Sequence, residues 1–246
     1  MCFLQWNIPG GIQMQLLLDF CAVILGYLLG SIPVGFLIVR LKTGQDIRTV
    51  ESGRTGGTNV VRAAGFWAGF LTALLDILKG VVSVWLARAM SQHQIVHVLA
   101  PIATILGHNY SLFIAERDEN GKMKFRGGAG GATALGGAVG LWYPIFPIII
   151  TIGALIWFTL GIASVTTMAV GLVVIVVFAI RSSLGLQSST YIWFGVIAEL
   201  LLIWALRPNI QKLISGNERV IKYSLNGWLR ARKSNPETGG TSDDSK

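Results

Sequence analysis

Long apolar segments fill most of this chain, and they limit its fold more than any other feature. A helix that crosses the hydrocarbon core of a bilayer needs about 20 mainly apolar residues. The composition agrees with such helices, because 52% of the residues are apolar and 13% are charged, with a mean hydropathy of +0.61, outside the range of ordinary soluble domains. The candidate spans lie at 14–39, 66–88, 94–115, 129–143, 144–161, 164–181 and 190–207. The sequence therefore predicts an all-α integral membrane protein, a bundle of about seven transmembrane helices with glycine-rich loops.

The borders are least distinct between residues 129 and 161, where two apolar stretches run together. This region could form one span with irregular backbone. It could also form two helices joined by a short turn near Trp142, Tyr143 and Pro144, and we expect this pair.

A single membrane domain is expected at 14–222, preceded by a short external lead at 1–13. The segment 223–246 ends in NPETGGTSDDSK, which is polar and lacks an apolar period. We therefore expect a disordered tail after the last span.

The basic residues predict the orientation of the bundle. No Lys or Arg precedes Arg40, so the first apolar segment lacks the positive region of a secretory signal peptide and should remain as a membrane helix. Loops two and six hold only Arg88 and Arg181. Loops one and three and the tail hold most of the others: Lys42, Arg48, Arg54, Arg62, Arg117, Lys122, Lys124, Arg126 and seven more from Arg207 to Lys233. The positive-inside bias then places the N-terminus outside and these loops in the cytoplasm.

The net charge of +8 is explained by this topology and by attraction to anionic membrane lipids. Nucleic acid is a poor candidate partner, because the charges are divided among three loops of a bilayer protein. Cys2 and Cys21 suggest neither a disulfide framework nor a zinc site. The sequence also lacks HExxH, paired CxxC, P-loop and GxSxG motifs, so it indicates no metal site, nucleotide hydrolysis or serine hydrolase.

Two glycine-rich runs stand out against this apolar background. SGRTGGTNVVRAAG at 52–65 could present backbone N–H groups to a phosphate, with Arg48, Arg54 and Arg62 adding guanidinium contacts. It could equally be a cytoplasmic connector. RGGAGGAT at 126–133 is a second candidate cradle, although its later glycines also suit close contact between helices.

Four other polar residues lie in or near the spans. Asp76 and Lys79 share a helical face and could form an ion pair or orient a charged substrate. His108 could transfer protons or serve a structural role. Ser31 precedes Pro33, where a proline frees backbone groups that hydroxyls can satisfy.

In order along the chain, these clusters resemble the bacterial integral-membrane acyl-phosphate:glycerol-3-phosphate acyltransferases. That family reads GSIPxG, DxRxxGSGNxGATNxxR, DxxKG, GHxFxxF with a KGGKGVAT loop, and HxxNIxRLxxGTE. Here GSIPVG and DILKG match fully, and GHNYSLF matches loosely. The other matches are Asp46, Arg48, Ser52, Gly53, Gly56, Thr58, Asn59 and Arg62, then Asn209, Ile210, Leu213, Gly216 and Glu218. The resemblance covers about residues 20–222.

The resemblance implies a seven-helix enzyme of the bacterial cell membrane with its active face in the cytoplasm. The primary hydroxyl of glycerol 3-phosphate would attack an acyl phosphate, giving 1-acylglycerol 3-phosphate and inorganic phosphate, with no cofactor or metal. It assigns Ser31, Arg48 and Asn209 to catalysis. It assigns these residues to substrate and phosphate binding: Ser52, Gly53, Gly56, Thr58, Asn59, Arg62, Lys79, His108, Arg126, Gly127, Gly128 and Ser164. Ser164 is the first member of a family SxxS segment whose second member is Thr167 here.

Departures from the family pattern leave a second hypothesis open. Arg54 replaces an Asn, Gly57 an Ala, and Arg126 a Lys, while Ala129 and Leu206 replace a Lys and a His. Arg54 or Arg126 could supply the missing charge. Otherwise the chain would be a non-catalytic or substrate-shifted relative that binds phosphorylated lipid precursors. A small transporter finds little support, because the charged motifs gather on one side of the membrane.

Overall fold

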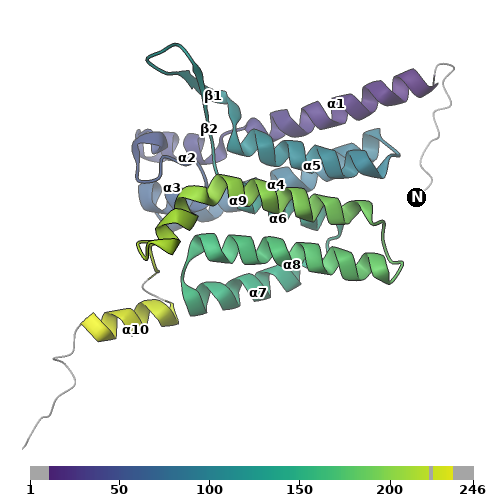
Figure 1. The fold of residues 1–246 in the computed structure, drawn as a ribbon. Coiled ribbons are helices and arrows are strands. Elements are labelled where there is room, and N and C mark those ends of the chain that lie inside the picture. The colour runs from purple at the N-terminus through teal and green to yellow at the C-terminus, as the bar shows by residue number, and fades with distance from the viewer. Residues whose placement is uncertain (1–10, 222–223, 235–246) are drawn as a thin grey trace, which may run out of the picture.

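A computed structural model describes residues 11–221 and 224–234 of the chain. Most of the expected external lead, residues 1–10, lies outside the described ranges. Figure 1 shows long helices lying side by side, with the first helix starting at one end of the bundle and the short helices and strands gathered at the other. The elements are α1 (Gly11–Ser31), α2 (Val34–Thr43), the 3-10 turn η1 (Ile47–Thr49), α3 (Gly57–Ala64), α4 (Phe66–Met90), α5 (Gln94–Asn109), β1 (Ser111–Arg117), β2 (Met123–Arg126), α6 (Gly131–Leu141), α7 (Ile145–Leu160), α8 (Ala163–Ser183), α9 (Thr190–Ile214) and α10 (Leu225–Ser234).

Each of the seven candidate spans contains a helix. Within the described residues, four helical segments are long and apolar enough to cross a membrane: Ile12–Thr43, Phe66–Met90, Ala163–Ser183 and Thr190–Ile214. Helices α6 and α7 are shorter, and they are separated at Trp142, as the expected helix pair requires. The prediction of an all-α membrane protein is confirmed, while the number of crossings stays a prediction.

The first span is interrupted where Pro33 follows Ser31 and Ile32. A proline has no N–H to donate, and its ring disfavours a helical conformation in the preceding residue. The chain leaves α1 here and resumes a helix as α2. Three short elements, α2, η1 and α3, then carry it around the end of the bundle to α4 (Figure 1).

The third apolar segment was expected to be helical to residue 115, and that border is wrong. Helix α5 ends at Asn109, and Ser111–Arg117 forms β1, which pairs with β2 in an antiparallel hairpin. Hydropathy alone does not separate these conformations, because Leu112 and Phe113 are as apolar as the helix before them. The hairpin projects from the charged end of the bundle (Figure 1).

The main core joins α4, α5, α6, α7, α8 and α9, with Phe178 and Phe194 among its fully buried side chains. Helices α4 and α6 approach closely because Gly80 faces the backbone of Thr133 and Gly136 faces that of Ile77. A methyl group at either glycine would overlap a carbonyl oxygen of the other helix. The small-residue interface that was an alternative for the second glycine run therefore does occur, within α6.

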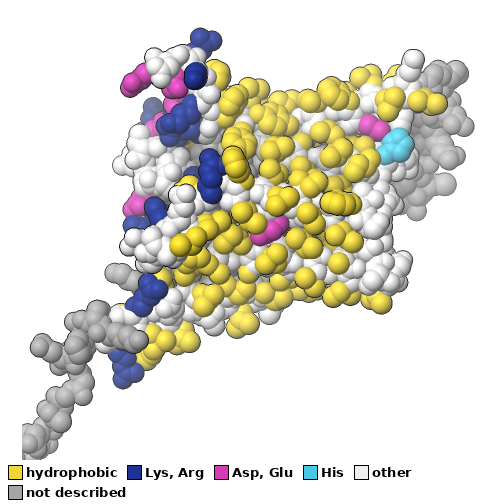
Figure 2. Space-filling view, viewed as in Figure 1, with side chains coloured by type: hydrophobic (Ala, Val, Ile, Leu, Met, Phe, Trp, Pro, Cys, Tyr) yellow, Lys and Arg dark blue, Asp and Glu magenta, His cyan; other side chains and the backbone are white. Residues whose placement is uncertain are grey.

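Hydrophobic side chains cover the middle of the molecule in the space-filling view, and Lys and Arg side chains gather at one end (Figure 2). This is the end that carries β1, β2 and α10 (Figure 1). Such a belt is what a lipid-exposed bundle requires, since lipid tails solvate apolar side chains.

The expectation of a disordered tail is wrong for Leu225–Ser234, which forms α10. Two hydrogen bonds hold this region against the end of α7: Ile221 N donates to Gly161 O at 2.8 Å, and Asn226 Nδ2 to Leu160 O at 3.1 Å. The other tail residues, 223 and 235–246, lie outside the described ranges.

Candidate active site

The two glycine-rich runs meet at the charged end of the bundle. The backbone N–H of Thr55 donates to Gly127 O at 3.2 Å, which joins the loop before α3 to the loop before α6. The backbone N–H of Gly128 donates to His108 O at 2.9 Å, which fixes the second loop to the end of α5. A side chain at Gly128 would overlap the imidazole of His108. The two runs therefore form one rigid surface and not two independent connectors.

Asn59 holds the first loop in place through side-chain hydrogen bonds to its backbone. Its side chain is buried, and its Nδ2 donates to Val50 O at 3.0 Å and to Arg54 O at 2.9 Å. These bonds use the amide nitrogen that the sequence assigned to substrate binding. The geometry makes Asn59 a brace that holds the loop curved around the site.

A cavity of about 250 Å³ lies against this surface. Three arginines reach it, Arg54 from the first loop, Arg126 from the end of β2 and Arg207 from α9. Its other lining residues are Ser52, Gly53, Asn109, Tyr110, Gly127, Gly128, Trp204, Ala205 and Pro208. No carboxylate lines the cavity within the part of the chain that the structure describes. Positive charge without a lining counter-charge favours an anionic ligand in this cavity.

Pro208 explains why α9 offers polar groups here. A proline inside a helix leaves the carbonyl four residues earlier without its usual donor. That carbonyl belongs to Trp204, and the guanidinium of Arg207 approaches it at 3.4 Å. Arg207 of α9 therefore lies beside the freed carbonyl, and the next one, Ala205 O, accepts a hydrogen bond from Arg54 of the first loop.

Arg54 connects the first loop to α9. Its Nη1 donates to Asn209 Oδ1 at 3.0 Å, and its Nη2 donates to Ala205 O. Asn209 Nδ2 in turn donates to Glu218 Oε1 at 2.9 Å, and Ser164 Oγ donates to the same oxygen at 3.2 Å. Burial lowers the pKa of the Arg54 guanidinium, Glu218 opposes that shift, and Arg207 adds to it. Asn209 therefore orients Arg54 while its own amide is oriented by Glu218.

Arg48, predicted to be catalytic, does not line the cavity and is held by two carboxylates. It pairs with Asp46 at 2.5 Å and with Glu116 at 2.5 Å, and it lies over the ring of Phe36. The hydrogen bond from Arg48 lowers the pKa of the Asp46 carboxyl, and the carboxylate of Asp46 raises the pKa of Arg48. These contacts join the first loop to β1, so the geometry gives Arg48 a bracing position.

Lys79 and His108 belong to a separate buried cluster with Asp76. Lys79 Nζ lies 2.9 Å from Asp76 Oδ1 and 3.3 Å from His108 Nδ1. The same ammonium donates to Gly30 O and Ile32 O, both at 3.1 Å. These are two of the carbonyls at the break between α1 and α2, where we expected hydroxyls to act, so Lys79 shares this role with the hydroxyl of Ser111, which donates to Ser31 O. Of the two alternatives for Asp76 and Lys79, the structure shows the ion pair.

Some of the remaining predicted site residues line the arginine cavity, and the others lie at or on α3. Ser52, Gly53, Arg126, Gly127 and Gly128 line the arginine cavity. Gly56 is the N-cap of α3, whereas Thr58 and Arg62 are exposed on that helix.

Ser31 is fully buried, and its Oγ has no hydrogen-bond partner in the described parts of the chain. Its carbonyl accepts a bond of 2.5 Å from Ser111 Oγ, beside the Lys79 cluster. The structure thus brings together the glycine runs, Arg126 and Asn209, and it keeps Arg48, Lys79 and His108 outside the cavity lining.

Sequence reasoning missed Arg207 and Tyr110 as residues of the site. Arg207 was counted only as a topology signal, although its place two residues before the motif residue Asn209 could have identified it. Tyr110 lines the cavity, and its hydroxyl accepts a bond of 3.0 Å from Trp204 Nε1.

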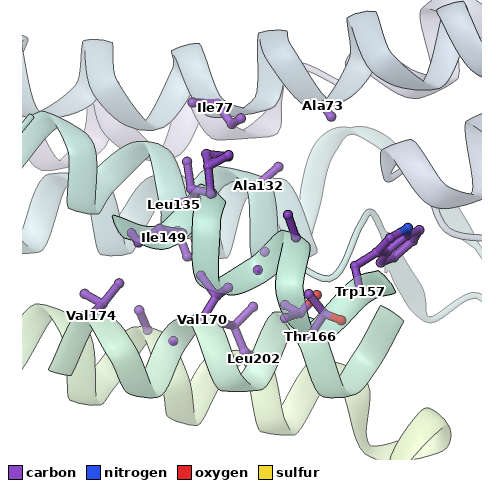
Figure 3. Close-up of a pocket in the computed structure, with 18 of the residues that line it drawn as sticks. Ala73, Ile77, Ala132, Leu135, Ile149, Trp157, Thr166, Val170, Val174 and Leu202 are labelled. Atoms are coloured by element: carbon purple, nitrogen blue, oxygen red, sulfur yellow. The ribbon is translucent and has the colours of Figure 1, made fainter. Parts of the chain in front are cut away.

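A second, apolar cavity of about 430 Å³ lies within the bundle (Figure 3). Ile77 of α4 and Leu135 of α6 face Val170 and Val174 of α8 across it, and Trp157 of α7 lies toward one end (Figure 3). Thr167, the second member of the family SxxS segment, also lines it. Its volume falls in the range of ligand sites, roughly 300–1,000 Å³.

Fold and site define a helical integral membrane protein with a cationic cavity at one end of the bundle and an apolar cavity inside it. The sequence profile of the glycerol-3-phosphate acyltransferase family matches residues 20–216, and the chain belongs to this family.

The relatives named glycerol-3-phosphate acyltransferase include one from Rubrobacter xylanophilus, 36% identical over 204 residues, covering 82% of this chain and 95% of the relative. Another, from Lawsonia intracellularis, is 31% identical over 211 residues, with 85% and 98% covered.

Solved structures agree with the family. A crystal structure of PlsY, an integral membrane glycerol 3-phosphate acyltransferase, in its glycerol 3-phosphate form has a TM-score of 0.72 and 30% identity, covering 82% of this chain and 95% of that one. The lysophosphatidic acid form has a TM-score of 0.70 and 28% identity, with 86% and 98% covered.

Proposed function

We propose that this protein transfers an acyl group from an acyl phosphate to the sn-1 hydroxyl of glycerol 3-phosphate, at the cytoplasmic face of a bacterial cell membrane. The observation that carries the proposal is the cavity lined by Arg54, Arg126 and Arg207 on a surface built from both glycine-rich loops. Membership of the family and the glycerol 3-phosphate and lysophosphatidic acid forms of PlsY support it.

The reaction needs little from the protein beyond charge and position. The acceptor hydroxyl oxygen attacks the carbonyl carbon of the acyl phosphate and forms the ester bond. The bond from that carbon to the phosphate oxygen breaks, inorganic phosphate leaves, and the hydroxyl proton passes to phosphate or water. Both substrates carry phosphate, so fixed guanidinium groups and backbone donors can hold them near each other and stabilise the charge that develops. The long acyl chain requires an apolar neighbour, and the cavity between α4 and α8 offers one.

Turnover in a defined membrane tests this proposal. The purified protein in lipid nanodiscs is given palmitoyl phosphate and labelled glycerol 3-phosphate, and phosphate release and labelled lysophosphatidate are measured together. We expect equal amounts of both products, and Asn209→Ala should lose most of the rate because it frees Arg54 from its orienting bond. Release of phosphate without labelled lipid would contradict the proposal.

A substrate-shifted or non-catalytic relative is the second candidate, favoured by Ala129 and Leu206. Leu206 is buried at 6% exposure and does not line the cavity, so the residue that replaces the family His contributes no polar group there. Binding of glycerol 3-phosphate without turnover in the same nanodiscs would support this candidate over the enzyme.

The orientation is tested separately with a single cysteine in the hairpin. Asn120→Cys, in a chain with Cys2 and Cys21 replaced by Ser, should resist impermeant thiol reagents added outside intact cells and react after permeabilisation. Position 120 is preferable to Gly121, whose φ of +75° disfavours a side chain. Labelling in intact cells would place this end of the bundle outside.

A further inference from the structure

The arginine cavity holds more positive charge than its protein surroundings balance. Arg126 has only a long ion pair, 3.5 Å from its Nε to Glu116 Oε2, and Glu116 also pairs with Arg48 at 2.5 Å. The acid whose charge acts on Arg54 is Glu218. Glu218 Oε1 already accepts hydrogen bonds from Ser164 and Asn209. A guanidinium taken partly out of water without a paired carboxylate is costly unless an anion completes its surroundings.

Arg54 is the best placed of the three arginines to grip such an anion. It is half-buried, and two of its five N–H groups are used, one on Asn209 Oδ1 and one on Ala205 O. The other three N–H groups donate to no protein group within the described residues. Anchoring one edge of a planar guanidinium removes much of the conformational entropy that a free arginine loses on binding a phosphate.

The sequence points to the same residue independently. At position 54 the family pattern has a neutral Asn, and at positions 129 and 206 it has a Lys and a His where this chain has Ala129 and Leu206. This chain therefore gains a cation at one position and loses polar groups at two others. Neither Ala129 nor Leu206 lines the cavity, whereas Arg54 does.

We infer that Arg54 is the specificity-determining residue for the acceptor, holding the phosphate dianion of glycerol 3-phosphate through N–H groups left free by its anchor on Asn209. This inference rests on the proposed function. It differs from a purely structural role, in which Arg54 only ties the first loop to α9. A structural tie would affect both substrates and the melting temperature, while a specificity residue affects chiefly the KM for the acceptor.

The test compares Arg54→Gln, Arg54→Lys and the control Arg117→Gln, which removes one exposed cation from the neighbouring hairpin. We expect Arg54→Gln to raise the KM for glycerol 3-phosphate on the order of 100-fold, since a charge-assisted bond to a buried anion carries roughly this factor. The KM for palmitoyl phosphate should change less than threefold. Arg54→Lys should keep the fold but recover little of the affinity, because an ammonium cannot contact Asn209, Ala205 and a phosphate in the same planar arrangement. Arg117→Gln should match the wild type.

An Arg54→Gln variant whose acceptor KM stays within twofold of the wild type would overturn the inference, as would equal loss for both substrates.

Calorimetric binding of glycerol 3-phosphate separates this inference from the proposed function. A wild type that binds glycerol 3-phosphate without turnover contradicts the enzyme but still tests Arg54, since Arg54→Gln should then abolish the binding. A wild type that neither turns over nor binds overturns both.

Discussion

Two polar clusters in this molecule both contain cationic side chains, but only one of them contains the carboxylate that neutralises its cation. In the Asp76, Lys79 and His108 cluster, the cation meets a carboxylate at 2.9 Å and two backbone carbonyls at 3.1 Å, and the side chains of Asp76 and Lys79 are almost fully buried. The cavity of Arg54, Arg126 and Arg207 has positive groups and no lining carboxylate among the described residues. A cluster that neutralises itself supports the fold, and one that does not is available to a ligand.

Lys79→Met should have the largest effect, because it leaves Asp76 with only the longer contact to His108 Nδ1 at 3.4 Å and removes the donor to the carbonyls of Gly30 and Ile32. Removing one partner of a buried ion pair costs about 3–5 kcal/mol. We expect a large fall in melting temperature in detergent, with activity lost through unfolding. Asp76→Asn with Lys79→Met should be less destabilised than the sum of the single variants. A Lys79→Met protein that is as stable as the wild type but binds no substrate would show that this cluster, too, serves the ligand.

Gly128→Ala should have the next largest effect, since the added methyl group would overlap His108. Forcing extra volume into a packed contact costs about 1–3 kcal/mol. The loop that would be displaced contributes Gly127 to the lining of the arginine cavity. Turnover should therefore fall together with stability. Thermal unfolding and steady-state rates measured on one preparation check this, and unchanged values for both would mean that the loop can move away from His108 freely.

Arg207→Gln should weaken acceptor binding less than Arg54→Gln does. Arg207 is exposed and also lies over the ring of Trp204, so water already compensates part of its charge. We expect a KM increase of about tenfold, equivalent to roughly 1.4 kcal/mol, with little change in melting temperature. An effect on KM larger than that of Arg54→Gln would shift the specificity role to α9.

Asp46→Asn should have the smallest effect. Arg48 lowers the pKa of the folded Asp46 carboxyl. A lowered pKa contributes stability that is present above the unfolded value of about 3.9 and is lost as the pH falls through the folded pKa. The pair is partly exposed, so we expect less than ~1 kcal/mol at pH 7. The melting temperatures of wild type and variant should converge below pH 4, and a difference that grows toward low pH would contradict this sign.

The sequence predicted the parts of the fold that depend on apolar length. The helices within the seven segments and the turn near Trp142 follow from hydropathy and from Pro144. The hairpin after Asn109 did not, because an apolar strand and an apolar helix end have the same hydropathy. At the Pro33 break a hydroxyl, that of Ser111, does satisfy Ser31 O, but the part played by Lys79 was missed, since Lys79 lies 47 residues from Ile32 in the chain and no local pattern connects them.

The residue types of the candidate site could be predicted from the sequence, but the contacts between those residues could not. The motif matches alone identified both glycine runs, Arg126 and Asn209. The roles of these residues in binding and catalysis stay predictions. They could not show that Arg54 donates a hydrogen bond to Asn209, which lies 155 residues away in the sequence. Nor could they show that Arg48 forms ion pairs with Asp46 and Glu116. Such contacts depend on how α9 and β1 return to the first loop, and this is tertiary information.

The contact between α4 and α6 has an evolutionary consequence. Gly80 and Gly136 meet backbone atoms of the opposite helix, so neither position tolerates a side chain, and the spacing of α4 and α6 beside the apolar cavity is fixed. On the other side, an added Cβ at Gly171 of α8 would overlap the carboxylate of Glu199, whereas one at Gly153 of α7 would meet only a methyl group of Val170, at 3.3 Å. Lineages that adapt this cavity to longer or shorter chains should therefore record the change in α7, while the glycines of α4, α6 and α8 stay constant.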